Sequence, residues 1–223
     1  MPQYPNGFMA LTLRESDSVR TTSRTDYDYF NERWYTIPRV QEKPCWVLHR
    51  DKDNKLNLNE NDMIATYSYP LRNADGHFIG IVSTELSLLH ISQILAEERP
   101  YPHSYFALID EQGRYIGHPD TSRLFDKTIF SVADAEQQAD IIALGYEMTA
   151  GKRGSMSVKV NDESCMVCYM PVDGTTWSLA IVCPDSDVFR VLIVPIRVVQ
   201  HPTNVKSAIW LVVMNSVGKL LFS

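Results

Sequence analysis

Hydrophobic and polar positions follow two different rhythms along the first part of the chain. Aromatic residues recur at helical spacing over residues 27–41, which predicts a helix with an aromatic stripe that Pro38 disturbs. Residues 63–71 and 77–87 instead alternate with a period of two and predict strands. The Asp-Gly pair at 75–76 predicts a hairpin turn between them, because glycine adopts a positive φ without a steric penalty.

The pattern changes after this hairpin. Residues 88–98 carry apolar residues at helical spacing and predict a second helix. Arg-Pro-Tyr-Pro at 99–102 breaks the pattern and indicates a domain boundary. Earlier in the chain, residues up to about 26 are polar, and residues 49–63 form a polar, Asn/Asp-rich loop.

The second part of the chain predicts five strands and one long helix. The helical pattern over 131–151 is the longest, with Ser131 as a candidate N-cap and Gly151 as a C-terminal stop. The predicted strands are short and cover residues 104–110, 114–117, 154–161, 164–172 and 176–183. Two strands, a helix and three strands in this order indicate an α+β fold with an antiparallel sheet.

Two similar stretches occur at 73–80 ("NADGHFIG") and 110–117 ("DEQGRYIG"). They fall at different places in the order of elements, so we interpret their similarity as shared turn chemistry. A better alignment joins two stretches that lie about a hundred residues apart, 67–82 and 168–182. Each of these has an aromatic strand, a Pro followed by an apolar residue, an Asp-Gly turn and an Ile-Val strand. This alignment predicts two related modules in tandem, the first without its opening strands and helix, so that the chain begins inside a module.

Composition and charge narrow the classes of function. The net charge of −6, from 27 acidic and 21 basic residues, argues against a general nucleic-acid binder, which would need a basic face. The 44% hydrophobic and 22% charged residues are ordinary globular values and argue against global disorder.

The C-terminus is apolar in two short segments, 191–199 and 208–214. Prolines and polar or charged residues interrupt them, whereas a transmembrane helix needs about 20 predominantly apolar residues. Two interpretations stay open, a truncated membrane-inserting segment and a buried terminal helix with a loose tail. The N-terminus lacks the basic start and apolar core of a secretory signal peptide.

Cys165 and Cys168 have the C-x-x-C spacing of redox and zinc sites. Their segment predicts a strand, in which positions i and i+3 point to opposite faces, and no second ligand pair completes a zinc set. We therefore expect ordinary buried thiols. A thiol redox enzyme that uses this pair stays an alternative, as does a disulfide through Cys45 or Cys183.

Asp110, His118 and Asp120 are candidates for acid–base chemistry. No nucleophile at a recognisable spacing and no phosphate-binding glycine loop accompanies them. We expect His118 to be a structural hydrogen-bonding residue.

Four segments together resemble a known family. They are "ERWYTIPRVQEKPCW", "YSYPLRNADGHFIGIVSTELSL", "SYFALIDEQGRYIGHPD" and "WSLAIVCPDSDVF". Over roughly residues 27–190 their order and spacing resemble the double-Cache sensor domain, the extracytoplasmic ligand-sensing region of bacterial membrane receptors. The most similar variety belongs to receptors whose cytoplasmic part is a histidine kinase or a metal-dependent serine/threonine phosphatase.

The resemblance implies two tandem PAS-like modules, each an antiparallel sheet flanked by helices, and a stalk helix that is missing here. Residues 1–98 would be a membrane-distal module that is incomplete at its N-terminus, residues 99–186 a membrane-proximal module, and residues 187–223 a helix and apolar tail leading towards the membrane. It also implies a periplasmic location on an inner-membrane protein of a two-component type system. No enzymatic activity, cofactor or metal is expected. The expected partner is a small-molecule ligand rather than nucleic acid, and a homodimer through the stalk is compatible with the family.

In this family the ligand usually binds in the distal module, between the sheet and a Trp-Tyr segment. Carried over to this sequence, that position implies ligand contacts from Trp34, Tyr35, Trp46, Tyr67, Tyr69 and Glu85. Aromatic walls with polar tips suit a small amphipathic ligand. The alternative is that these aromatic residues only pack in the core.

Amino-acid-binding members carry an Arg two residues before the Trp and an Asp after the last strand. Glu32 and Glu85 occupy these positions here, and Arg33 would point about 100° away on a helix. We therefore do not expect an ordinary α-amino acid. Two acids near one pocket favour a cationic or polyhydroxylated ligand, or solvent exposure of one of the two acids. The leading hypothesis is a sensor in which ligand closure biases a two-state receptor. The alternatives are the thiol redox enzyme and a non-binding structural or dimerisation spacer.

Overall fold

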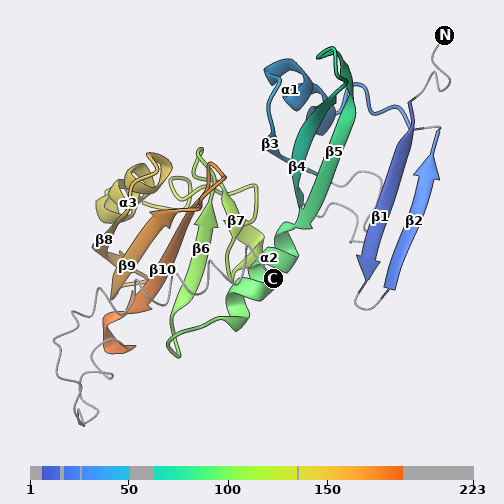
Figure 1. Ribbon diagram of the computed structural model, residues 1–223. Coiled ribbons are helices and arrows are strands. Elements are labelled where there is room, and N and C mark those ends of the chain that lie inside the picture. Colours follow the sequence, from blue (N-terminus) through green and yellow to red (C-terminus); the bar gives the residue numbers. More distant parts are fainter. Residues whose placement is uncertain (1–6, 16–17, 26, 51–62, 135, 188–223) are drawn as a thin grey trace, which may run out of the picture. The chain divides into compact units, whose positions relative to one another are not determined.

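The computed structural model describes residues 7–15, 18–25, 27–50, 63–134 and 136–187. These residues form two compact units that divide between Ser87 and Leu88 (Figure 1). All neighbouring strands in both units are antiparallel. The apolar segments 191–199 and 208–214 lie outside the described residues.

The first unit combines a hairpin, a three-stranded sheet and one helix. Its elements are β1 (Met9–Glu15), β2 (Ser18–Arg24), α1 (Arg33–Gln41), β3 (Cys45–Arg50), β4 (Met63–Arg72) and β5 (Phe78–Ser87). β1 pairs with β2, and the sheet has the order β3-β4-β5. The predicted β4–β5 hairpin is confirmed. The β1–β2 hairpin was not predicted, because β2 consists almost entirely of polar residues and lacks an apolar alternation.

α1 begins at Arg33 and not at residue 27. Residues 27–32 stay outside the helix, and Tyr29 is fixed there by the backbone of Phe8. The Tyr29 hydroxyl accepts the Phe8 N–H (3.2 Å) and donates to the Phe8 carbonyl (3.1 Å). Pro38 lies inside the helix, where its missing N–H costs one intrahelical hydrogen bond. The aromatic residues at 27–32, which were predicted to be part of the helix, therefore precede it.

The second unit is built on a five-stranded sheet. Its elements are α2 (Leu88–Glu97), β6 (Tyr105–Ile109), β7 (Tyr115–Gly117), the 3-10 helix η1 (Thr121–Arg123), α3 (Ala139–Thr149), β8 (Gly154–Val160), β9 (Glu163–Pro171) and β10 (Ser178–Pro184). The strand order is β7-β6-β10-β9-β8. This confirms the predicted α+β fold with an antiparallel sheet. No helix in the described part of the chain is long and apolar enough to cross a membrane.

α2 packs on β7 of the second unit. Gly117 leaves the space for it, because a Cβ at that position would come within 2.7 Å of Leu95 and 3.4 Å of Ile91. Ile91 and Leu95 are both buried. The boundary between the compact units therefore leaves α2 with the second unit, while the predicted boundary at 98/99 assigns this helix to the first module. The two divisions differ by this one helix.

α3 begins at Ala139 and is shorter than the predicted helix over 131–151. Ser131 does not cap it. Its hydroxyl instead closes a turn with Thr128, donating to the Thr128 carbonyl (3.1 Å) and accepting the Thr128 N–H (2.9 Å). The predicted stop at Gly151 is confirmed, since Gly151 has a φ of +66° and donates its N–H to a carbonyl of the last helical turn (3.0 Å).

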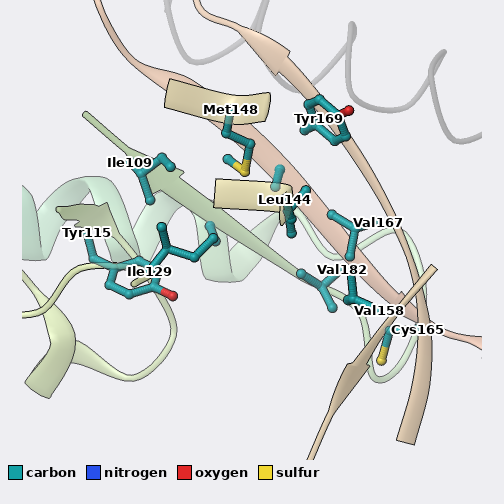
Figure 2. Packing of buried hydrophobic residues seen from close by; sticks show 12 residues of the cluster. Ile109, Tyr115, Ile129, Leu144, Met148, Val158, Cys165, Val167, Tyr169 and Val182 are labelled. Carbon is teal, nitrogen blue, oxygen red and sulfur yellow. The ribbon is translucent and has the colours of Figure 1, made fainter. Parts of the chain in front are cut away.

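The main core of the second unit lies between α3 and the sheet. Figure 2 shows Leu144 and Met148 of α3 packed with strand residues that include Ile109, Val167 and Val182. Ile109 and Val167 are fully buried. Each side chain of this size contributes roughly 1.5–3 kcal/mol on full burial, so the contact between α3 and the sheet is a main source of the unit's stability.

Asn73 and Asp110 close their hairpins with the same hydrogen bonds. In each case the side-chain Oδ1 accepts the N–H groups two and four residues later, those of Asp75 and His77 (3.1 and 2.8 Å) and those of Gln112 and Arg114 (2.9 and 2.9 Å). The glycine three residues on has a positive φ in both, +82° and +78°. Shared turn chemistry, as predicted, explains the similarity of the two stretches.

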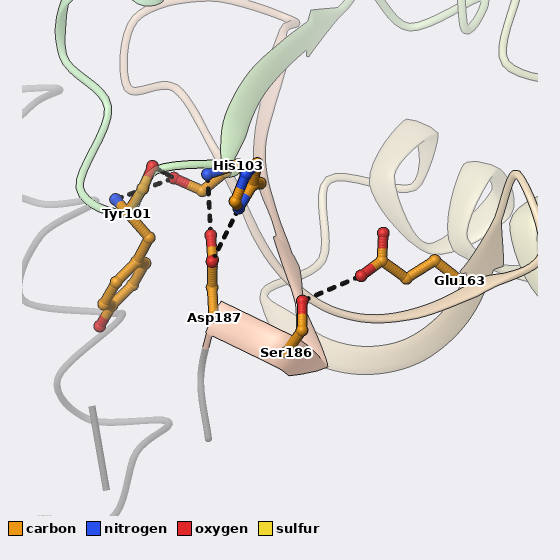
Figure 3. Close-up of polar contacts among 6 residues, drawn as sticks. Tyr101, His103, Glu163, Ser186 and Asp187 are labelled. Atoms are coloured by element: carbon orange, nitrogen blue, oxygen red, sulfur yellow. Dashed lines mark hydrogen bonds and ion pairs between the residues drawn. The ribbon is translucent and has the colours of Figure 1, made fainter. Parts of the chain in front are cut away.

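The last described residues are held against the start of β6. Figure 3 shows the Asp187 carboxylate, which accepts the backbone N–H of His103 (2.8 Å) and lies 2.9 Å from His103 Nδ1. In the same turn Ser186 donates to Glu163 (3.0 Å). Asp187 is 2% exposed, so the chain leaves the described part of the second unit from an anchored position.

Cys165 and Cys168 both lie on β9, and the strand directs them to opposite faces, as predicted. Cys165 packs in the core under α3. The four cysteines are free thiols. Burial raises the pKa of Cys165 to about 11 and the pKa of Cys183 to about 12. Thiols with raised pKa values stay protonated at neutral pH and are poor nucleophiles.

We predict that Asp110→Ala destabilises the chain more than Asn73→Ala. Asp110 is 1% exposed and also accepts a hydrogen bond from Arg114 Nε (2.7 Å), whereas Asn73 is exposed. Hydrogen bonds to charged groups contribute about 1.5–3 kcal/mol and neutral ones about 0.5–1.5 kcal/mol. We therefore expect the free energy of unfolding to fall by about 3 kcal/mol for Asp110→Ala and by about 1 kcal/mol for Asn73→Ala. Urea denaturation followed by circular dichroism measures both, and equal losses would contradict the assignment.

We also predict that the three buried cysteines do not react in the native chain. A chromogenic disulfide reagent at neutral pH should modify only the half-buried Cys45, and Cys45→Ser should remove that reaction. All four thiols should react after unfolding. Rapid native reaction of Cys165 or Cys168 would instead favour a redox pair.

Candidate functional site

The register of the three-stranded sheet sorts its residues between two faces. Residues directly opposite one another share a face, and successive residues along a strand alternate. Two cross-strand rows lie on one face, Val47–Thr66–Glu85 and Cys45–Ser68–Ser83. α1 covers this face, because Trp34 and Tyr35 pack against Val47. We call the side that carries these two rows the α1 face.

Trp34 and Tyr35 form an aromatic wall over the α1 face. Each is 7% exposed, and their ring centroids lie 6.2 Å apart in an edge-to-face arrangement. Tyr29 contacts both rings, with centroid distances of 5.6 Å to Trp34 and 5.0 Å to Tyr35. Such aromatic pairs contribute about 0.5–1.5 kcal/mol beyond the burial of their area, so the wall is held in one arrangement.

The hydroxyl of Tyr35 stays protonated at neutral pH. Burial raises its pKa, and the nearby guanidinium of Arg39 offsets part of that rise. The Arg39 guanidinium lies 5.8 Å from the centre of the Tyr35 ring. The wall therefore carries a neutral hydroxyl beside a cation at the edge of the aromatic cluster.

Polar side chains form the floor of the α1 face. Thr66 and Ser68 are fully buried although both carry hydroxyls. The Thr66 hydroxyl lies 2.7 Å from His49 Nε2, and the Ser68 hydroxyl lies 2.8 Å from that of Ser83. A covered sheet face normally carries apolar residues, and a buried hydroxyl without a partner costs about 1–3 kcal/mol. The polar residues of this covered face are thus hydrogen-bonded to one another, which keeps their burial from being costly.

Glu85 adds an acidic group to this floor. It lies opposite Thr66 in the β4–β5 register. One of its carboxylate oxygens, Oε2, is buried, as is the indole Nε1 of Trp34. A carboxylate among hydroxyls in a covered site favours a cationic or hydroxyl-rich partner, because these groups donate hydrogen bonds to it.

Trp46, Tyr67 and Tyr69 lie on the opposite face of the same sheet. Trp46 and Tyr67 are direct neighbours across β3 and β4, with ring centroids 5.1 Å apart. Tyr69 lies two residues further along β4 on the same face and is 52% exposed. The structure therefore divides the six predicted ligand contacts into two trios on opposite faces.

The sequence analysis did not include the polar floor of His49, Thr66, Ser68 and Ser83. A partial indication was available, because the alternation along β4 puts Thr66 and Ser68 on one face and the tyrosines between them on the other. His49 lies in the stretch 49–63 that was predicted as a loop, so its position in β3 was not expected.

Arg33 is exposed beside the buried Trp34, which agrees with the expectation that it points away from the wall. Glu32 directly precedes α1, and its carbonyl accepts the N–H groups of Tyr35 and Thr36 (3.1 and 2.9 Å). Within the described residues, no three His, Cys, Asp or Glu side chains gather in a group that could hold a metal ion.

A family model described as a Cache domain matches residues 5–192, which is most of the 223 residues. The chain therefore belongs to the Cache-domain family. None of the curated protein sequences compared with the chain matches it.

Solved structures with a similar fold are extracellular or periplasmic sensor domains. The extracellular domain of mmHK1S-Z3, a candidate histidine kinase, has a TM-score of 0.61 at 15% identity, over 79% of this chain and 61% of that one. That of soHK1S-Z6, another candidate histidine kinase, has a TM-score of 0.60 at 19% identity, over 85% and 69%. The ligand-binding domain of the Pseudomonas aeruginosa chemoreceptor PctB, in complex with L-Arg, has a TM-score of 0.55 at 18% identity, over 86% and 72%.

The TM-scores of these three structures show a common fold. The chain spans 61% of the length of the mmHK1S-Z3 domain, so it corresponds to part of that structure.

Proposed function

We propose that this chain is the extracytoplasmic small-molecule sensing domain of a signal-transduction receptor, with ligand binding in the first unit coupled to an output across the membrane. Membership of the Cache-domain family supports a sensing role. The observation that carries the site is the buried, hydrogen-bonded polar floor beneath Trp34 and Tyr35.

In this proposal the chain holds two tandem PAS-like modules. Residues 1–98 form the membrane-distal module, residues 99–186 the membrane-proximal one, and residues 187–223 lead towards the membrane. The two compact units, each with its own antiparallel sheet, support two modules, with α2 grouped with the second unit. The domain would lie in the periplasm as part of an inner-membrane receptor, with a homodimer as its signalling form.

The ligand would occupy the α1 face. Trp34 and Tyr35 would supply the apolar contacts, and Glu85 with the hydroxyls of Thr66 and Ser68 would hold its polar groups. Because Glu85 brings a negative charge, the proposed ligand class is cationic or polyhydroxylated. One solved neighbour holds the cationic amino acid L-Arg. Trp46, Tyr67 and Tyr69 face the other side of the sheet, and the proposal gives them no contact with this ligand.

The proposed route of the signal ends at Asp187. Two contacts from His103 hold its carboxylate at the start of β6. A ligand-dependent shift of the second unit would move this anchored position. In this proposal the shift passes through Asp187 because its carboxylate is held by His103.

The thiol redox alternative finds less support. Cys165 and Cys168 face opposite sides of β9, and the pKa of Cys165 is raised by burial and by the carboxylates of Glu163 and Asp185. A redox pair needs converging sulfur atoms and a lowered pKa.

We predict that Glu85→Gln weakens binding of a cationic ligand by about 10- to 100-fold, because it removes the charge that strengthens hydrogen bonding. Isothermal titration with putrescine as the cationic probe and glucose as the polyhydroxylated probe measures this on the full chain. Tyr69→Ala is the matched control, since Tyr69 lies on the same sheet but on the opposite face, and it should leave the affinity unchanged.

Two outcomes would overturn this assignment. Loss of binding in Tyr69→Ala but not in Glu85→Gln would place the ligand on the opposite face. Tight binding of ordinary zwitterionic amino acids that is lost in Glu85→Ala would contradict the proposed ligand class. A thermal-shift screen without any response to acids, amines, sugars and purines would favour the non-binding spacer, because a ligand of the folded state raises the midpoint.

A further inference from the structure

A cavity of about 100 Å³ lies inside the second unit, between α3 and the sheet. Most of its wall is aliphatic, formed by Ala107, Ile109, Ile129, Val132, Ile141, Leu144, Met148, Val158, Val160, Val167, Ala180 and Val182. An apolar cavity of about 150 Å³ in another protein holds benzene, so this one has room for a smaller molecule. It belongs to a different unit from the α1 face.

One part of the wall is polar, and its side chains form a connected cluster. The His118 ring contacts the rings of Tyr105 and Tyr115, with centroid distances of 5.5 and 5.0 Å. The Arg123 guanidinium lies 5.9 Å from the centre of the Tyr115 ring. Among the described residues that line the cavity, Arg123 carries the only charge at neutral pH.

His118 presents a neutral N–H donor. Its Nδ1 accepts the backbone N–H of Asp120 (2.9 Å) and lies 3.3 Å from the Asp120 carbonyl oxygen. The shorter contact assigns the ring proton to Nε2. Burial lowers the pKa of His118 to about 4, and the nearby positive charge of Arg123 adds to this effect. At neutral pH the imidazole is therefore uncharged, and its Nε2–H is the group that remains for the cavity. The prediction of a structural hydrogen bond to His118 is confirmed, and the other side of the ring is left for a ligand.

Tyr115 and Arg123 supply further donors. Arginine can only donate hydrogen bonds, so the Tyr115 oxygen accepts the bond from Arg123 and keeps its own O–H to donate. Asp120 accepts the Arg123 Nε–H (3.2 Å) and is 49% exposed. The terminal amino groups of the guanidinium carry four N–H donors, so donors remain for other acceptors after the bond to Tyr115. These donors converge at one end of an aliphatic chamber.

Solvent reaches this end of the cavity. The Arg123 side chain is 33% exposed, Gln138 is half-buried and Asn161 is exposed, and all three belong to the cavity lining. A small molecule can therefore enter beside the polar cluster, with its charged group last.

We propose that this cavity is a second binding site, one that takes a short-chain aliphatic monocarboxylate. The carboxylate would lie against Arg123, Tyr115 and His118, and the tail would lie among the aliphatic residues under α3. A cation would be repelled by Arg123, whose acidic partner Asp120 lies outside the cavity lining. A wholly polar anion such as phosphate would lose its hydration against the aliphatic wall without new partners there.

The test is a thermal-shift and calorimetric comparison of four probes on the full chain at matched ionic strength. The probes are propionate, its neutral isostere propionamide, propylamine and inorganic phosphate. Propionate alone should raise the unfolding midpoint at millimolar concentration. Arg123→Gln should weaken propionate binding by at least about 10-fold, because a charge-assisted hydrogen bond is lost. Lys127→Gln removes the same charge from the same loop outside the cavity lining and should have no effect.

A second variant keeps the proposal testable if Arg123→Gln folds poorly. Ala107→Val adds two methyl groups to the cavity wall and should abolish propionate binding while the chain keeps its native circular dichroism spectrum. Equal responses to propionate and propionamide, no response to any probe, or undiminished binding in Arg123→Gln or Ala107→Val would overturn the site. Glu85→Gln should leave propionate binding intact, so a failure of the first-unit site and a failure of this one are distinguishable.

Discussion

The cross-strand register of β4 and β5 is the constraint on which the first unit depends. Asn73 fixes it at the turn by accepting two backbone N–H groups, and Gly76 supplies the positive φ that the turn requires. A shift of one residue would turn Thr66 and Ser68 away from α1 and bring Tyr67 beneath it. The turn at the end of the hairpin therefore determines which strand residues lie on the α1 face. Trp34 and Tyr35 of α1 then cover those residues.

The two units use the same arrangement of a helix over an antiparallel sheet for different surfaces. In the first unit the covered strand residues include hydroxyls and an acid beside Val47, and the helix contributes the aromatic wall. In the second unit most of the strand residues that line the cavity are aliphatic, and the polar groups come from two strand tyrosines and from the segment that contains His118 and Arg123. The difference lies in which residues occupy the covered positions of each strand. Two covered sheet faces of different chemistry are then present within one chain.

Much of the fold could be predicted from local patterns. The period of two gave the strands, Asp-Gly gave the β4–β5 turn, and Gly151 gave the end of α3. The starts of α1 and α3 were wrong, because hydrogen bonds by Tyr29 and Ser131 hold the preceding residues in non-helical conformations. These hydrogen bonds do not produce a periodic pattern of apolar residues in the sequence, so the pattern could not predict them. For the same reason the β1–β2 hairpin, with its polar second strand, was not predicted.

By itself the sequence determined the turns, the alternation along each strand and the opposite directions of Cys165 and Cys168, as well as membership of the Cache-domain family. These features depend on residues within a few positions of one another or on the order of whole segments. Only the tertiary structure decided that Trp34 and Glu85 share the α1 face while Tyr67 does not, and that His118 and its neighbours line one end of an aliphatic cavity. Such contacts join elements that are far apart in the chain. Hydrophobic periodicity indicates that one face of an element is covered, but it does not identify the element that covers it.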